Sequence, residues 1–337
     1  MTTKKIGAQT AALANPPSFA GWANVAGKKE GEGPLADTFD YIDGDDTFGE
    51  STWEKSESAM QKQALGLALN KAGQAASSLD WLFAGDLLNQ CIGSSFAARG
   101  QEIPFFGLYG ACSTMGEGLA LASMTLDGGF GEWAAVTASS HFCSAERQYR
   151  NPLEYGGQRT PTTQWTATAA GAAVLAREGP GPYITHVTAG KIVDKGITDT
   201  NNMGAAMAPA AHATITAHFS DTGRSPSSYD LIVTGDLGVL GSELLIELLR
   251  KDGIQLHNHA DCGAMLFDLQ NQDVHCGGSG CGCCASVLTG HLLNSMKAGK
   301  WKNILFCPTG ALHSPISAFQ GESIPGICHA IAISTTK

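Results

Sequence analysis

The fold of this chain is decided by one stretch of sequence, Phe105-Phe-Gly-Leu-Tyr-Gly-Ala-Cys-Ser-Thr-Met-Gly-Glu-Gly-Leu-Ala-Leu-Ala-Ser-Met124. An apolar run ends at Tyr109, Gly110 is expected to make a tight turn, and Cys112 stands where a helix should begin. The stretch therefore predicts a strand, a sharp elbow and a helix, with a thiol at the elbow.

The position of Cys112 has two interpretations. At a helix start, a thiol meets unpaired N–H groups and the positive end of the helix dipole, which favour a thiolate and anionic ligands. A cysteine can also be a small buried hydrophobe. Gly110 and the pair Ser113-Thr114 are what an exposed elbow needs, so Cys112 and Ser113 are candidate ligand-binding residues.

Composition narrows the class of protein. The chain has 337 residues, 43% of them hydrophobic and 15% charged, which fits one large or two fused medium globular domains. The net charge of −10 disfavours nucleic acid and anionic lipid as partners. The start lacks an apolar signal core and no apolar run is long enough to span a membrane, so we expect a cytoplasmic location. The ten cysteines, two of them adjacent, are expected to be reduced thiols.

The order of the predicted elements is that of an α/β protein. Residues 1–50 are rich in Gly, Pro and Asp and are expected to form an extended arm packed on the body. After the arm we predict a helix over 52–72, a strand over 79–84, a helix over 87–98, the elbow with its helix to about 127, strands over 134–140, 168–175 and 183–188, and a helix over 202–219.

An internal repeat divides the chain. The segment Asp80-Trp-Leu-Phe-Ala-Gly-Asp-Leu-Leu matches Asp230-Leu-Ile-Val-Thr-Gly-Asp-Leu-Gly in residue type, and the elbow is echoed by Gly280-Cys-Gly-Cys-Cys. We therefore predict two related halves, 1–178 with the N-terminal arm and 179–337, in which Asp86 matches Asp236. Pseudosymmetric packing would bring both helix starts to one pocket, which makes Cys281 a further candidate ligand-binding residue.

These features resemble the thiolase and ketoacyl-synthase superfamily. Within it, a set of motifs distributed over nearly the whole chain is similar to the stage V sporulation protein AD family. The motifs are Phe83-Ala-Gly-Asp-Leu-Leu-Asn-Gln, Gly107-Leu-Tyr-Gly-Ala-Cys-Ser-Thr, Ala145-Glu-Arg-Gln, Glu154-Tyr-Gly-Gly-Gln, Met207-Ala-Pro-Ala-Ala, Asp261-Cys-Gly, Gly277-Gly-Ser-Gly-Cys and Pro308-Thr-Gly-Ala-Leu. The resemblance implies a thiolase-like fold, with two pseudo-duplicated α/β halves in α-β-α-β-α layers.

The same resemblance implies a function without a cofactor. It points to a non-catalytic component of the sporulation membrane channel system that binds dipicolinic acid for its uptake into the developing spore. Such a protein would be peripheral at the spore inner membrane, held there by other membrane subunits of the system. Superfamily precedent also leads us to expect a homodimer.

An active condensing enzyme is the alternative. Such enzymes pair the nucleophilic cysteine with two histidines, or with one histidine and one asparagine. The corresponding loops here read His257-Asn-His-Ala-Asp-Cys-Gly and Gly280-Cys-Gly, so neither pattern is intact. If the protein is an enzyme, Cys112 would accept the acyl group and His257, His259, His275 or His313 could substitute as its partner. A structural subunit with a vestigial pocket is the third possibility.

Two arginines and a histidine follow the strand after the elbow helix. Forked guanidinium donors on Arg147 or Arg150 would match a pyridine dicarboxylate, and His141 lies just before them. The alternative is a solvated turn in which Glu146 forms an ion pair. We name His141, Arg147 and Arg150 as candidate ligand-binding residues.

We expect no metal site. Histidines and cysteines gather between 257 and 284, but only Cys281-x-Cys283-Cys284 approaches a zinc-binding spacing, and it is too cramped for a usual site. Small thiols at a close helix packing explain the pattern better.

Overall fold

The computed structural model describes residues 4–149 and 159–337, and each half of the chain contributes five main strands in the same order. The first half runs β6 (Phe105–Leu108), β5 (Trp81–Gly85), β7 (Trp133–Ser140), β9 (Ala169–Ala176) and β3 (Ser18–Ala26). The second half runs β12 (His259–Asp261), β11 (Leu231–Thr234), β14 (Asn303–Cys307), β17 (Ala330–Ser334) and β10 (Tyr183–Thr188).

Strand directions repeat as well. In the first half, β5 pairs in parallel with β6 and β7, and β9 pairs antiparallel with β7. In the second half, β11 pairs in parallel with β12 and β14, and β17 pairs antiparallel with β14. The two halves join into one sheet where Ser18 of β3 pairs with Tyr183 of β10. This duplicated topology confirms the predicted thiolase-like fold class, while the proposed division at residues 178 and 179 stays a prediction.

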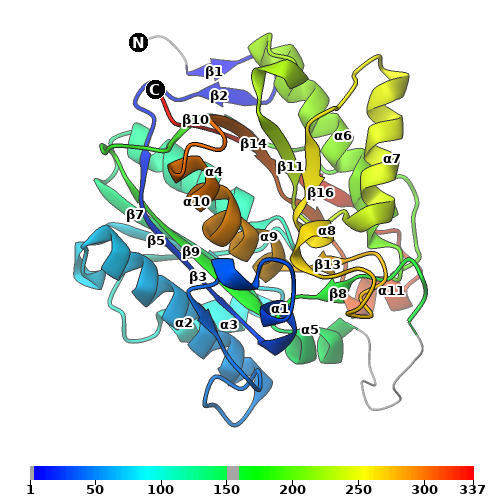
Figure 1. Ribbon diagram of the computed structural model, residues 1–337, viewed down its shortest axis with the longest axis horizontal. Coiled ribbons are helices and arrows are strands. Elements are labelled where there is room, and N and C mark those ends of the chain that lie inside the picture. The colour runs from blue at the N-terminus through cyan, green and yellow to red at the C-terminus, as the bar shows by residue number, and fades with distance from the viewer. Residues whose placement is uncertain (1–3, 150–158) are drawn as a thin grey trace.

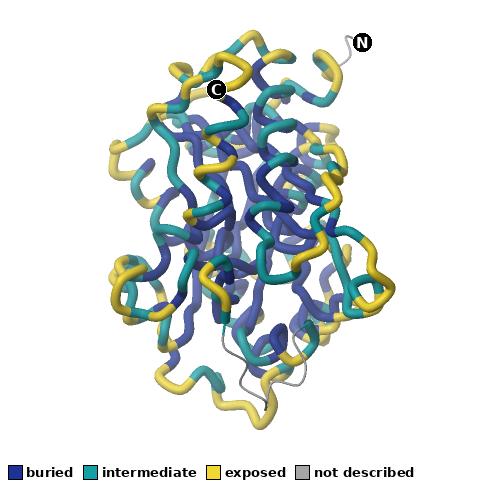
Figure 2. Tube along the Cα trace, turned by 90° about the vertical axis from the view of Figure 1, so that its right-hand side faces the viewer, coloured by how far each residue is buried: buried dark blue, intermediate teal, exposed yellow. Residues whose placement is uncertain are grey.

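Helices lie between and outside the two halves of the sheet. The central layer holds α4 (Thr114–Asp127), α9 (Cys281–Val287) and α10 (Leu293–Lys297), the last two joined by a π-helical turn, Leu288–Leu292. The outer layers hold α2 (Trp53–Ala72) and α3 (Ile92–Ala98) on one side, and α6 (Met203–Thr222) and α7 (Gly238–Lys251) on the other (Figure 1). Because α4 contacts strands of both halves, it lies inside the sandwich, and Figure 2 shows the buried interior that results.

Short elements complete the described chain. They are β1 (Lys5–Ile6), β2 (Thr10–Ala12), α1 (Lys28–Gly31), β4 (Tyr41–Ile42), α5 (Phe142–Tyr149), β8 (Trp165–Thr166), α8 (Cys262–Leu266), β13 (Gly278–Ser279), β15 (Thr309–Ala311), α11 (Pro315–Phe319) and β16 (Gly326–Cys328). None of the helices in the described ranges is both long enough and apolar enough to cross a membrane.

The prediction of an extended arm over residues 1–50 was wrong in its centre. Residues Ser18–Ala26 form β3, which pairs with β9 along its whole length and is buried. The prolines at 16 and 17 suggested a turn, but they stand just before the strand, where no ladder hydrogen bond is lost. Pairing with β9 decided the conformation, and that partner lies about 150 residues away in the sequence.

The predicted helix over 87–98 begins later, at Ile92. The buried carboxylate of Asp86 accepts hydrogen bonds from the backbone N–H groups of Leu88 at 2.9 Å and Ser94 at 2.7 Å. These bonds hold the intervening segment in a loop, with Gln90 and Cys91 in the left-handed region. A side chain therefore overrides the helical pattern of this segment.

The central helices approach the sheet so closely that glycine is required. A Cβ atom on Gly282 of α9 would lie 2.0 Å from the carbonyl oxygen of Ala169 in β9. A Cβ atom on Gly171 of β9 would lie 2.3 Å from the carbonyl oxygen of Ala285 in α9. Backbone therefore meets backbone in both directions, and neither partner can move aside as a side chain could.

We expect Gly282→Ala to lower the free energy of unfolding by about 1–3 kcal/mol, because the added methyl group overpacks this contact. The matched control is Gly66→Ala in α2, where a Cβ atom meets nothing within 4 Å. That change should raise stability by up to about 1 kcal/mol, the helix preference of alanine over glycine. Urea unfolding followed by circular dichroism measures both, and equal effects of the two variants would contradict the close packing.

Candidate functional site

The elbow between β6 and α4 is held by short local hydrogen bonds. The hydroxyl of Ser113 donates to the carbonyl of Gly110 at 2.7 Å, and that of Thr114 donates to the carbonyl of Ala111 at 2.6 Å. The residue of the turn in the left-handed region is Ala111, with φ of 49°. Glycine is needed at 110 for space, since a Cβ atom there would lie 2.7 Å from the Ser113 oxygen.

Cys112 is buried beside a carboxylate contributed by the second half. Its sulfur lies 3.7 Å from the hydroxyl of Ser279, which donates to Asp236 at 3.3 Å. Asp236 also accepts from the hydroxyl of Thr309 at 2.8 Å and from the backbone N–H of Gly280 at 3.3 Å. The two halves thus share one polar cluster behind the elbow.

The charge state predicted for Cys112 was wrong. Burial, and after it the negative charge of Asp236, raises the pKa of the Cys112 thiol well above its usual value. Burial also raises the pKa of Asp236 itself, to about 7. The helix start was expected to favour a thiolate, but loss of water and a neighbouring carboxylate outweigh it, so the thiol is neutral at neutral pH.

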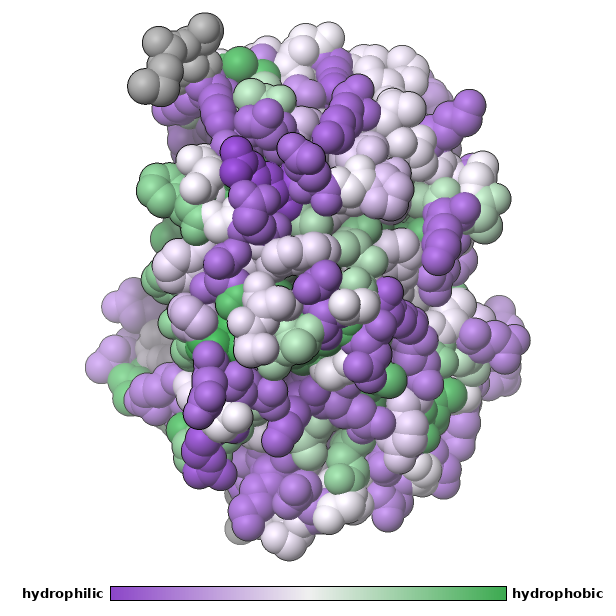
Figure 3. All heavy atoms as spheres, turned by 90° about the vertical axis from the view of Figure 1, so that its left-hand side faces the viewer, coloured by the Kyte–Doolittle hydropathy of each residue, from purple (hydrophilic) through white to green (hydrophobic). Residues whose placement is uncertain are grey.

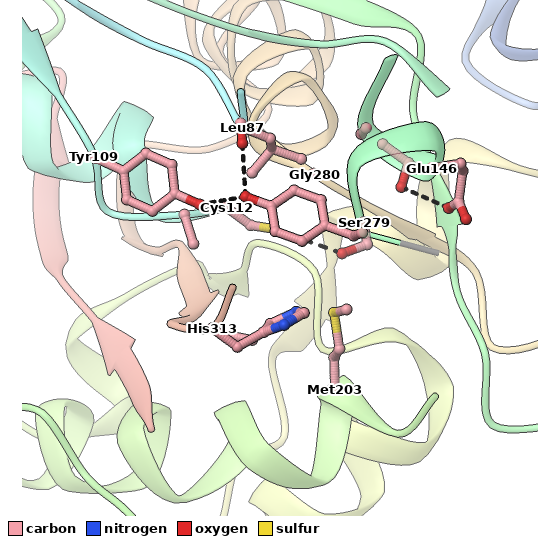
Figure 4. Close-up of a pocket in the computed structure, with 13 residues that line it drawn as sticks. Leu87, Tyr109, Cys112, Glu146, Met203, Ser279, Gly280 and His313 are labelled. Atoms are coloured by element: carbon pink, nitrogen blue, oxygen red, sulfur yellow. Dashed lines mark hydrogen bonds between the residues drawn. The ribbon is translucent and has the colours of Figure 1, made fainter. Parts of the chain in front are cut away.

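A pocket opens onto Cys112, with an empty volume of about 470 Å³ that includes the space at its mouth. Tyr149 donates to the carbonyl of Leu87 at 2.7 Å, which leaves the Tyr149 oxygen to accept from Tyr109 at 2.5 Å. The ring of His313 lies 5.3 Å from that of Tyr149. Figure 4 shows Tyr109 and His313 on different sides of Cys112, and Tyr149 belongs to the same lining, so aromatic rings form much of the walls.

One acidic side chain belongs to the described lining. Glu146 of α5 is buried and accepts from the hydroxyl of Thr166 at 3.2 Å. No arginine or lysine belongs to the part of the lining that the structure describes. Within the described lining, His313 and hydrogen-bond donors are the groups available to a carboxylate ligand.

Two of the predicted ligand-binding residues support the elbow from behind. Ser113 is fully buried and its hydroxyl is used within the turn. Cys281 is fully buried at the start of α9, and its thiol donates to the carbonyl of Ala111 at 2.9 Å. The two helix starts are adjacent, as the repeat predicted, but of their cysteines Cys112 lines the pocket and Cys281 does not.

The basic candidates lie elsewhere. His141 is buried, its Nδ1 accepts from the N–H of Cys143 at 3.2 Å, and its Nε2 lies 2.9 Å from the carbonyl of Asp46. Arg147 is exposed, forms an ion pair with Glu54 and lines a different hollow. Neither residue lines the Cys112 pocket. Arg150 lies outside the described residues.

Three of the four histidines named as possible catalytic partners do not line the Cys112 pocket. His259 contacts the hydroxyl of Thr234 at 3.0 Å, and His275 pairs with Asp273 at 3.1 Å. His257 lines a separate surface hollow. Of the candidate histidines, His313 alone is found in the described lining. Among residues 4–149 and 159–337, no group of three or more His, Cys, Asp or Glu side chains is arranged to hold a metal ion.

Sequence reasoning missed Glu146, Tyr149 and Met203 as lining residues. Glu146 and Tyr149 are three positions apart in α5, which puts them on the same face of the helix, and Arg147 points away from that face. A helix assignment for this segment could have separated the two groups. From the sequence we predict no helix for this segment and name a solvated turn only as the alternative.

Comparisons with known proteins agree with this architecture. The family model described as stage V sporulation protein AD matches residues 7–334. The stage V sporulation protein AD of Bacillus subtilis (strain 168) is 41% identical over 329 residues, covering 97% of each chain.

Solved condensing enzymes share the fold at low sequence identity. OleA from Xanthomonas campestris is similar with a TM-score of 0.61 and 16% identity, over 96% of this chain and 99% of that one. The 3-oxoacyl-[acyl-carrier-protein] synthase III from Aquifex aeolicus gives a TM-score of 0.57 and 14% identity, over 94% and 99%. The duplicated thiolase-like fold, the elbow motif and the family match together show that this chain belongs to the stage V sporulation protein AD family.

Proposed function

We propose that this sporulation protein is a non-catalytic binding protein that holds dipicolinic acid in the Cys112 pocket, for uptake into the developing spore. The observation that carries the proposal is the retention of the elbow pocket around a neutral, buried thiol beside Asp236. A condensing enzyme needs an activated thiolate there and partners that stabilise an oxyanion. The carboxylate of Asp236 beside Cys112 would disfavour both the negative thiolate and a negative oxyanion.

The pocket offers contacts for a flat aromatic acid. Tyr149 and His313 form walls against which a pyridine ring can pack. His313 is the group that we propose to contact a ligand carboxylate, since the described lining holds no arginine or lysine.

We expect His313→Gln to weaken dipicolinate binding by about 2 kcal/mol or more, as for loss of one partner of a desolvated charged contact. Cys112→Trp should abolish binding in this pocket by filling it. The matched control is His257→Gln, which changes a histidine of another hollow and should leave the affinity for dipicolinate unchanged. Arg147→Ala should also leave it unchanged, because the Arg147 guanidinium pairs with Glu54. Isothermal titration calorimetry measures all four, and unaltered binding by the Cys112 variant would move the ligand away from the elbow.

A condensing enzyme remains the second candidate function, because Cys112 and His313 line the same pocket and the fold is that of condensing enzymes. The raised pKa of Cys112 argues against it.

Incubation with acetyl-coenzyme A should therefore leave the chain unmodified in intact-mass spectrometry. One acetyl group per chain, lost in Cys112→Ala, would establish the enzyme instead. No acylation together with no dipicolinate binding would favour a structural subunit with a vestigial pocket.

We further propose that the chain forms a homodimer through the edge strand β6. In the described sheet β6 pairs with β5 on one side, which leaves its other edge open. Phe106 on this strand is 49% exposed and Phe96 of α3 is 48% exposed. Figure 3 shows hydrophobic side chains at the surface on the side of the molecule that carries β5 and β7. An open edge with aromatic side chains favours pairing with a second copy.

Light scattering should give the mass of a dimer, and Phe106→Asp should give a monomer, because a buried unpaired charge opposes association. Phe130→Asp changes a residue that is 72% exposed and should leave the dimer intact. A monomeric parent chain would refute this interface.

Family membership also leads us to propose where the protein acts. We place it at the spore inner membrane, in contact with other membrane subunits of the same channel system. Co-purification of those subunits with the parent chain from sporulating cells would test this contact. The same experiment with Phe106→Asp would test whether the contact needs the dimer.

A further inference from the structure

A second hollow lies at the other end of the molecule from Cys112. It is bounded by β10 near His186, by the start of β14 at Asn303 and by the end of β17 at Ser334, and its empty volume is about 680 Å³ including its mouth. Figure 1 shows β10 close to the two chain termini, whereas β8, β13 and α5, which flank Cys112, lie at the opposite end.

This hollow has the charge that the Cys112 pocket lacks. Arg224 and Lys337 line it, next to the ring of His186, and no aspartate or glutamate belongs to its described lining. The guanidinium groups of Arg147, Arg159, Arg177 and Arg250 each pair with a carboxylate. Between described residues, no ion pair includes Arg224. In a protein with a net charge of −10, this is a local concentration of positive charge.

A line of hydrogen bonds runs from Asp221 toward the hollow. The carboxylate of Asp221 can only accept, so the Thr10 hydroxyl donates to it at 3.0 Å. Thr10 then accepts from the Thr188 hydroxyl at 2.8 Å. With its proton used in this way, Thr188 accepts from Nδ1–H of His218 at 2.7 Å. The carboxylate thus fixes which nitrogen of His218 carries the proton.

The same line ends on Arg224. Burial, together with the charges of His186 and Arg224, lowers the pKa of His218 to about 3, so its ring is neutral and Nε2 is an acceptor. Tyr229 donates to Nε2 at 2.5 Å, and the Tyr229 oxygen accepts from Nη1 of Arg224 at 3.0 Å. Because every donor points toward Asp221, the Tyr229 oxygen faces the guanidinium as an acceptor and holds it at the hollow.

Burial and then the charge of Arg224 lower the pKa of the neighbouring His186 to about 4. A bound anion would relieve this unfavourable positive potential. The rest of the wall includes apolar side chains, namely those of Leu13, Pro16, Ala332 and Ile333. An occupant with an anionic end and an apolar body satisfies both features.

We infer that the hollow at Arg224 is a second binding site, which takes a small organic carboxylate. The carboxylate would accept two parallel hydrogen bonds from the guanidinium, and the apolar body would lie against the side chains of the β17 end and the N-terminal arm. The amide of Asn303 and the hydroxyl of Ser334 lie on the same lining and can hydrogen-bond a polar substituent. This site is separate from the Cys112 pocket and does not depend on the function proposed for it.

The test uses calorimetric titration of the full chain with pyridine-2-carboxylate, a flat monocarboxylate, and separately with inorganic phosphate. In the Cys112→Trp background, where the first pocket is filled, we expect pyridine-2-carboxylate still to bind at one site. Arg224→Gln should weaken this binding about tenfold or more, and Arg224→Lys, which keeps the charge, should weaken it less. Arg250→Gln makes the same charge change at an exposed residue paired with Glu247 and should have no effect.

A second variant tests the hydrogen-bonded line without changing charge. Tyr229→Phe removes the oxygen that holds the guanidinium and should weaken binding severalfold while thermal unfolding shows a folded chain. Binding that is equal in the parent and in Arg224→Gln would overturn the proposal. So would loss of all binding in Cys112→Trp, which would place the probe in the first pocket. Phosphate that binds at Arg224 as tightly as pyridine-2-carboxylate would overturn the assignment to an organic carboxylate.

Discussion

The structure depends on the close contact between the central helices and the sheet. Gly282 of α9 meets the backbone of Ala169, and Gly171 meets the backbone of Ala285, so α9 of the second half lies directly on β9 of the first half. Contacts at this distance leave no freedom to shift one half along the other. They bring the start of α9 beside the elbow before α4, and this places Asp236 and Ser279 behind Cys112.

That juxtaposition decides the chemistry. In isolation, a cysteine at a helix start is expected to ionise readily. Here the elbow is buried, and the second half supplies a carboxylate within the same polar cluster, so the pKa of the thiol rises instead. The elbow of the thiolase-like fold is kept while its thiol stays neutral. A pocket with aromatic walls and one buried glutamate opens onto it.

The Cys112 pocket and the Arg224 hollow differ in how their polar groups are fixed. Around Cys112, the hydroxyls of Ser279 and Thr309 converge on the carboxylate of Asp236. At the other end, a line of hydrogen bonds starts from Asp221 and ends on Arg224, so its last member faces outward as a cation. The first arrangement neutralises a reactive group, and the second presents a charge to the hollow. Both rely on side chains from segments distant in the sequence.

Sequence alone determined the local and the repeated features. The strand, elbow and helix around Cys112 follow from apolar periodicity and small residues, and the duplicated halves follow from the match between the segments at Asp80 and Asp230. Backbone preferences and the spacing of apolar residues depend on residues close together in the sequence, so such features can be predicted from the sequence alone. The family resemblance rests on the same motifs.

Only the tertiary structure decided what surrounds each side chain. It made Ser18–Ala26 a central strand, directed Arg147 away from the pocket, turned Glu146 into it and brought His313 from a distant loop. It also set the protonation of Cys112, because a pKa depends on water and on charges that other segments supply. These properties arise from contacts between residues far apart in the sequence, and spacing along the chain does not encode them.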